Sequence, residues 1–171
     1  MHIAYTVAPG RGATDLLLAG LVRRMAARGF RAAGTVQMNV IPDPDGPCDM
    51  DVNVLPDGPV IRISQSLGPD ATGCRLDPGA LEEAVRLTLG RLEGAEFLIV
   101  NKFGKHEAGG RGFRPVIAEA LDLGLPVLVG LNRGNAEPFL SFTGGVAEEL
   151  APDEGVLADW LEARIGRTAA A

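Results

Sequence analysis

The chain has 171 residues, 46% of them hydrophobic, which suits one folded domain with a substantial core and argues against disorder. Its net charge of −6 argues against a dedicated nucleic-acid-binding protein, which needs a basic face to neutralise phosphates. No apolar run is long enough to cross a bilayer, and the first residues do not resemble a signal peptide. We therefore expect a cytoplasmic protein with reduced thiols and with no membrane or nucleic-acid partner.

The first half of the chain begins with a strand, a glycine-rich turn and a helix. Residues 2–7 are apolar and β-prone, residues 8–13 form the turn, and residues 14–28 have the apolar spacing of an amphipathic helix. Residues 31–76 follow as a predicted antiparallel insertion. It starts with a strand over residues 31–39 and continues with two β-prone runs on either side of an Asp-Gly pair, the pattern of a hairpin.

The second half alternates helices with short apolar strands. Helices are predicted over 77–92, 113–123 and 153–166, strands over 97–100 and 125–131, and loops over 101–112 and 132–145. Asp77 is expected to cap the first of these helices, with Pro78 in its first position. Strands that alternate with helices favour a parallel sheet with helical crossovers. The prediction is one three-layer α/β/α domain over residues 1–171, with a largely parallel sheet.

Three polar loops follow three of the predicted parallel strands, over residues 8–14, 101–107 and 132–135. The carboxyl ends of parallel strands meet at one edge, where open α/β sheets bind ligands. We therefore expect these loops to form one site for a small anionic ligand. The candidate ligand-binding residues are Gly10, Arg11, Gly12, Ala13, Thr14, Asn101, Lys102, Lys105, Asn132 and Arg133.

The first loop can be compared with the phosphate-binding pattern G-x-x-x-x-G-K-[ST]. Gly12 and Thr14 match this pattern, whereas Val7 replaces the first glycine and Ala13 replaces the lysine. Successive main-chain N–H groups at a helix start can still hold an anion. Without the lysine, no ammonium group at that position reaches the outer phosphates. A plain strand–helix turn with glycines for tightness is an equal interpretation of this loop alone.

The second loop resembles a motif of the small P-loop nucleoside-triphosphatases. The segment F-L-I-V-N-K-F-G-K-H-E is similar to h-h-h-h-D-E-h-G-K-M-E of that family, in which the Asp-Glu pair serves magnesium and the attacking water. Gly104, Lys105 and Glu107 match, whereas Asn101 and Lys102 replace the acidic pair. The resemblance implies a P-loop-like domain with degenerate phosphate and magnesium motifs. Mg²⁺ is not expected to bind strongly, and Lys105 and Glu107 are candidates for a catalytic role.

The segments C-D-M, I-S-Q-S-L-G, G-C-R-L-D-P and N-K-F-G-K-H-E-A-G-G-R-G-F are more closely similar to a bacterial family related to those enzymes. That family carries a domain-of-unknown-function label, and the resemblance implies an association with molybdate-transport genes. Within these central segments, Arg62, Gln65 and Arg75, together with Cys48 and Cys74, are candidates to line an anion pocket over the glycine loop. The cysteines have neither C-x-x-C spacing nor a nearby histidine, so no metal site is predicted.

Three functions remain open at this point. The first is binding of a nucleotide or another phosphate-bearing ligand with little or no hydrolysis. The second is binding or sensing of a small oxyanion such as molybdate or tungstate, and the third is an active nucleoside-triphosphatase with a rearranged site. Whether the protein is an enzyme is therefore undecided from sequence, and a protein partner or a homo-oligomer is compatible with every one of these functions.

Overall fold

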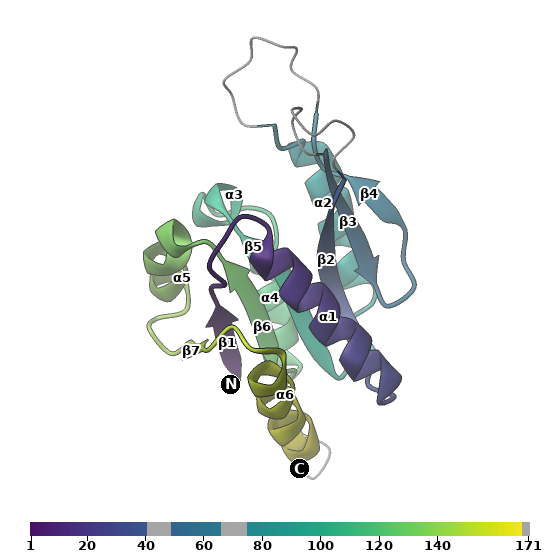
Figure 1. The fold of residues 1–171 in the computed structure, drawn as a ribbon, viewed down its shortest axis with the longest axis vertical. Coiled ribbons are helices and arrows are strands. Elements are labelled where there is room, and N and C mark those ends of the chain that lie inside the picture. Colours follow the sequence, from purple (N-terminus) through teal and green to yellow (C-terminus); the bar gives the residue numbers. More distant parts are fainter. Residues whose placement is uncertain (41–48, 66–74, 169–171) are drawn as a thin grey trace.

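A computed structural model of the chain describes residues 1–40, 49–65 and 75–168. Its elements are β1 (Ile3–Thr6), α1 (Ala13–Ala27), β2 (Ala32–Val40), β3 (Asp49–Leu55), β4 (Val60–Arg62), α2 (Pro78–Leu89), β5 (Phe97–Phe103), α3 (Lys105–Ala108), α4 (Arg114–Asp122), β6 (Val127–Leu131), η1 (Arg133–Asn135), α5 (Ala136–Phe142), β7 (Glu148–Leu150) and α6 (Glu154–Thr168). The strands form one seven-stranded sheet in the order β4-β3-β2-β5-β6-β1-β7 (Figure 1).

Most of this sheet is parallel, as predicted. Strands β2, β5, β6, β1 and β7 are parallel to one another, with Leu98 of β5 and Ile3 of β1 both opposite Val127 of β6. Strand β7 was not predicted, because two of its three residues are glutamates, which are uncommon in strands. It pairs only along β1 within the described residues and forms one edge of the sheet.

The other edge of the sheet is antiparallel. Strand β3 is antiparallel to both β2 and β4, which confirms the predicted hairpin around Asp57-Gly58. Strand β2 carries Gly34, whose φ of +119° is in the region that favours glycine, and a Cβ built there would lie 1.8 Å from the Ile99 carbonyl oxygen of β5. The glycine therefore allows β2 to lie against β5 on one side and β3 on the other.

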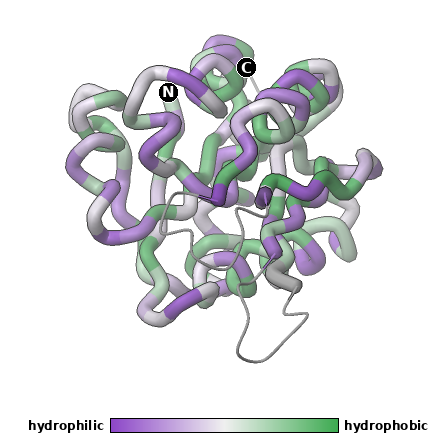
Figure 2. Tube along the Cα trace, turned by 90° about the horizontal axis from the view of Figure 1, so that it is seen from above, coloured by the Kyte–Doolittle hydropathy of each residue, from purple (hydrophilic) through white to green (hydrophobic). Residues whose placement is uncertain are grey.

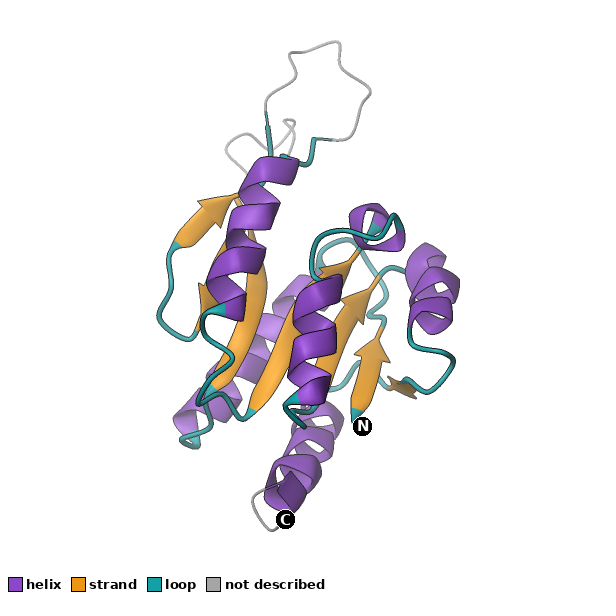
Figure 3. Cartoon of the chain, turned by 180° about the vertical axis from the view of Figure 1, so that it is seen from behind, coloured by secondary structure: helices purple, strands orange, loops and turns teal. Residues whose placement is uncertain are grey.

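Helices cover both faces of the sheet, which gives the predicted three layers (Figures 1 and 3). Residues Phe97 and Ile99 of β5 join the core formed with α1 and α6, whereas Leu98 and Val100 join the core formed with α2 and α4. Burial on both faces explains why the central strands are continuous apolar runs. Both hydrophilic and hydrophobic stretches occur along the surrounding helices in the hydropathy view, as expected of helices with one buried face (Figure 2).

The segment after the middle of β5 differs from the prediction. Strand β5 continues through Asn101 and Lys102 to Phe103, which is fully buried, and α3 begins at Lys105 without an intervening loop. Helix α5 also extends over two turns in the segment predicted as a loop. The helices α1, α2, α4 and α6 lie where they were predicted, to within a few residues. None of the helices in the described ranges is both long enough and apolar enough to span a membrane.

Candidate functional site

The strand order brings the three predicted site loops to one edge of the sheet. Strand β6 lies between β1 and β5, and all three are parallel, so their carboxyl ends point the same way (Figure 1). Neighbouring strands are about 4.8 Å apart, which places the ends of β1 and β5 roughly 10 Å from each other. The residues after β6, beginning with the exposed Asn132 and Arg133, lie between these two ends.

The glycine loop after β1 presents main-chain N–H groups at the start of α1. Gly10 and Gly12 have φ values of 104° and 74°, and the Thr14 hydroxyl accepts a hydrogen bond from the Ala8 N–H at 3.1 Å, which closes the loop. The Ala13 N–H donates a long bond of 3.4 Å to the Gly10 carbonyl. In the described part of the chain, no acceptor faces the main-chain N–H groups of Gly10, Arg11, Gly12 and Thr14. These four donors are available to an anion.

Four exposed cations at this edge of the sheet have no carboxylate partner among the described residues. Arg11, Lys102, Lys105 and Arg133 make no hydrogen bond or ion pair through their side chains with any described residue. Seven arginines elsewhere form ion pairs: Arg24 with Glu154, Arg28 with Glu162, Arg62 with Asp49 and Asp51, Arg75 with Asp49, Arg86 with Glu83, Arg91 with Asp57 and Arg164 with Glu148. The carboxyl edge therefore carries unneutralised positive charge on a chain whose net charge is −6.

Asn101 lies beneath this edge and connects three elements. Its side chain is 3% exposed, its Oδ1 accepts a hydrogen bond from the Gln37 N–H of β2 at 2.8 Å, and its Nδ2 donates to Asp15 Oδ1 of α1 at 2.8 Å. Both polar atoms are thus used within the protein. A Mg²⁺ ion requires oxygen ligands and favours carboxylates, whereas this strand end offers an engaged amide and the cation Lys102. The residues present here do not fit Mg²⁺.

Glu107 is also directed into the protein. It is 3% exposed, and its carboxylate accepts hydrogen bonds from the Gly104 N–H at 2.8 Å and the Phe113 N–H at 3.4 Å. A Cβ at Gly112 would lie 2.1 Å from Glu107 Oε1, so the loop folds tightly around this carboxylate. Lys105, in contrast, is exposed in the first position of α3. Of the two candidates for a catalytic role, only Lys105 is open to a ligand.

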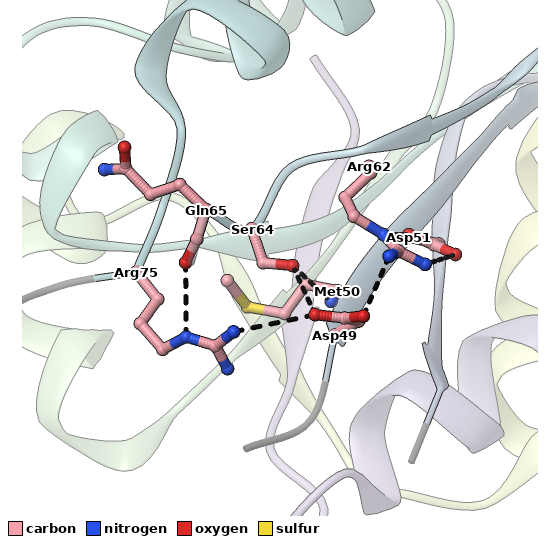
Figure 4. A network of polar contacts seen from close by, with 7 residues as sticks. All are labelled: Asp49, Met50, Asp51, Arg62, Ser64, Gln65 and Arg75. Atoms are coloured by element: carbon pink, nitrogen blue, oxygen red, sulfur yellow. Dashed lines mark hydrogen bonds and ion pairs between the residues drawn. The ribbon is translucent and has the colours of Figure 1, made fainter. Parts of the chain in front are cut away.

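The central candidates Arg62, Gln65 and Arg75 belong to a different polar network (Figure 4). Arg62 binds Asp51 through its Nε at 2.8 Å and Asp49 through its Nη1 at 2.8 Å. Arg75 donates to the Gln65 carbonyl at 3.3 Å and lies 3.5 Å from Asp49. The hydrogen bond from Arg62 lowers the pKa of Asp51, and the same contact raises the pKa of Arg62.

This network corrects the expectation of an anion pocket over the glycine loop. Its arginines are already neutralised by aspartates, and it surrounds β3 and β4, four and five strands away from β1. At a strand spacing of about 4.8 Å, that is roughly 20 Å from the glycine loop. Cys48 and Cys74 lie outside the described residues.

Sequence reasoning missed Glu82, which lies on α2 and reaches the segment after α3. Its Oε1 accepts a hydrogen bond from the Gly112 N–H at 3.1 Å and lies 3.1 Å from His106 Nε2. In the sequence, Glu82 resembles any other exposed residue of an amphipathic helix, so no local signal identifies it.

The strand order, with a glycine loop between β1 and α1, gives the chain the fold of the P-loop nucleoside-triphosphatases. Two solved structures share this fold. THEP1 from the hyperthermophile Aquifex aeolicus has a TM-score of 0.66 and 19% identity, and the match covers 96% of this chain and 99% of that one. A human cancer-related nucleoside triphosphatase has a TM-score of 0.62 and 18% identity, and the match covers 95% of this chain and 96% of that one. The chain belongs to the family described as "Protein of unknown function (DUF2478)", whose model matches residues 3–160.

A curated relative is the molybdenum import ATP-binding protein ModC 2 of Bradyrhizobium diazoefficiens. The two are 34% identical over 147 residues, which cover 85% of this chain and 16% of the relative. The chain therefore corresponds to a small part of that protein's length.

Proposed function

We propose that this protein binds a phosphate-bearing small ligand, with a nucleotide as the leading candidate, at the carboxyl edge of the sheet and with little or no hydrolysis. The observation that carries the proposal is the group of unpaired cations Arg11, Lys102, Lys105 and Arg133 around open main-chain N–H groups. Cations without carboxylate partners around a loop raise the local concentration of anions and steer them to it. The fold shared with nucleoside-triphosphatases supports a nucleotide as the first ligand to test.

Binding is proposed without efficient turnover because the groups that stabilise developing phosphate charge are replaced. Ala13 supplies no ammonium group, Asn101 has no charge, and Lys102 repels a metal ion. Removing one preorganised electrostatic group of this kind costs about 10²–10³-fold in rate. The cations of the edge compensate for ligand charge directly, so affinity does not require Mg²⁺.

Titration calorimetry with a panel of nucleotides and with tripolyphosphate, each in the presence and absence of Mg²⁺, tests the proposal. We expect binding that weakens as salt is added, because exposed charges are screened. Lys105→Ala should weaken it further, whereas Arg23→Ala, which removes an exposed cation in the middle of α1, should not. Absence of binding to every nucleotide and to tripolyphosphate would refute the proposal. Phosphate release that disappears in Lys105→Ala would instead favour an active hydrolase.

A small tetrahedral oxyanion is the second candidate ligand. The similarity to part of a molybdenum import ATP-binding protein favours it, as does the loss of a lysine at position 13, since a small anion needs N–H groups and a few cations only. A ligand that binds the folded state raises the midpoint of thermal unfolding by mass action. A midpoint raised by molybdate or tungstate, but not by sulfate at the same ionic strength, would support this candidate, and no shift with either metal oxyanion would remove it.

A further inference from the structure

A wide-open surface cavity of about 440 Å³ lies between α2 and the segment that joins α3 to α4, on the face of the sheet opposite α1. It is lined by Pro78, Gly79, Glu82, His106, Gly110, Arg111, Gly112 and Pro115. The prolines and glycines make most of this lining apolar, with proline rings contributed by both α2 and α4. A concave, mainly apolar surface with a few polar groups that fix orientation is a common form of small-ligand site.

The polar wall of the cavity is already ordered before any ligand arrives. Glu82 Oε1 is occupied by the Gly112 N–H and by the His106 ring, each at 3.1 Å, and the His106 side chain is 9% exposed. Glu82 Oε2 has no hydrogen-bond partner among the described residues, and the side chain is 49% exposed. Glu82 Oε2 can therefore accept a hydrogen bond from a ligand, while the two contacts of Oε1 hold the carboxylate in place.

Arg111 supplies the other charged group of the wall. It is exposed, and its guanidinium has no partner in the described part of the chain. A guanidinium plane can stack on an aromatic ring and leaves no lone pair to accept a hydrogen bond. Together with Glu82 it makes the charged part of the lining neutral, which suits an uncharged ligand.

We propose that this cavity binds a flat, uncharged heteroaromatic ring that carries an exocyclic or ring N–H donor, of which a purine base is the best probe. The N–H would donate to Glu82 Oε2, with the ring between the prolines and the Arg111 guanidinium. An ammonium ligand fits less well, because its three N–H donors need three acceptors, and the lining side chains offer one unoccupied carboxylate oxygen. The inference is independent of the phosphate site: a nucleoside without phosphate is expected to bind.

Ligand-observed saturation-transfer NMR on the full chain tests this with adenosine, guanosine and N6,N6-dimethyladenosine, which has no exocyclic N–H. We expect saturation of the ring protons of adenosine and guanosine, and a markedly weaker effect with the dimethylated ring. Glu82→Gln should weaken adenosine binding about tenfold, because the new amide places an N–H donor where Oε2 accepts. The neighbouring Glu83→Gln, outside the cavity lining, should leave it unchanged.

Three results would overturn the proposal: no saturation of either purine nucleoside, equal binding of adenosine and its dimethylated form, or equal binding by wild type and Glu82→Gln. Arg111→Ala provides a second variant that does not touch the hydrogen bond to Gly112, and it should reduce ring saturation in a protein with an unchanged unfolding midpoint. Tripolyphosphate binding, measured on the same samples, reports on the cationic edge alone. Its loss with retained nucleoside binding would refute only the phosphate proposal.

Discussion

Replacing Glu107 by alanine tests whether this glutamate is a structural residue of the α3 segment. The carboxylate is 3% exposed and accepts hydrogen bonds from the main-chain N–H groups of Gly104, at 2.8 Å, and Phe113, at 3.4 Å. Alanine leaves both donors without an acceptor. An unsatisfied buried donor costs about 1–3 kcal/mol, and the longer bond to Phe113 belongs at the lower end of that range.

The expected loss in the free energy of unfolding is therefore about 2–4 kcal/mol for Glu107→Ala. In a domain of this size, that lowers the midpoint of thermal unfolding by roughly 5–15 °C. Glu107→Gln should fall between wild type and Glu107→Ala, because its single amide oxygen can accept from one N–H while its NH₂ group opposes the other. Urea unfolding followed by circular dichroism measures both variants, with equal m values as the sign that only stability has changed.

Glu93→Ala provides the control, because Glu93 is exposed and no described residue pairs with it. Its unfolding curve should overlay that of wild type. If Glu107→Ala also unfolds at the wild-type urea concentration, the two hydrogen bonds do not hold the segment, and the structural interpretation of Glu107 is wrong. A stable Glu107→Ala protein with altered nucleotide turnover would point instead to a catalytic role.

Three other substitutions, the first with a matched control, probe the sheet and its edges. Gly34→Ala should destabilise the protein by about 3 kcal/mol or more, because its Cβ meets the main chain of β5, whereas Gly134→Ala, with no atom within 4 Å, should be tolerated in thermal unfolding. Asp51→Asn should cost less than about 1 kcal/mol, because Arg62 is 52% exposed. Arg62 lowers the pKa of Asp51 from its ordinary value of 3.8. The stability difference between wild type and Asp51→Asn, measured by urea unfolding, should therefore be constant above pH 3.8 and disappear as the pH falls through the lowered pKa of Asp51. Asn101→Asp should lower the urea midpoint at neutral pH by placing two carboxylates against each other.

The alternation of apolar runs and amphipathic helices was enough to predict the layers and the parallel core of the sheet. The cap of α2 was also predicted from local chemistry: Asp77 Oδ1 accepts a hydrogen bond from the Ala80 N–H at 3.1 Å. Helix α3 was not predictable in the same way. It is four residues long, and the Glu107 side chain that holds its start is recognisable only once the chain has folded around it.

The candidate site shows the same division between local and long-range information. The position of its loops follows from parallel strands, so the cations around the glycine loop could be predicted to lie at one edge. Whether an arginine is neutralised depends instead on register. Arg62 is opposite Asp51 across the β3–β4 pair, a relation set by the hairpin, and the sequence alone does not distinguish such a paired arginine from the unpaired Arg11.

The residues that differ from the P-loop motifs at the carboxyl edge of the sheet are coupled through Asn101. Its amide can donate to Asp15 in the first turn of α1, which an aspartate at that position could not do while both carboxylates are ionised. Asp15 in turn brings a negative charge to the helix end that would otherwise attract an anion most strongly. Lys102 of β5 and Lys105 of α3 bring positive charge to the same edge of the sheet, two strands away from β1. An acidic residue at position 101 alone would therefore oppose Asp15 rather than create a magnesium site. If the protein binds without turnover, as proposed, a hydrolytic site would need changes at positions 13, 15, 101 and 102 together.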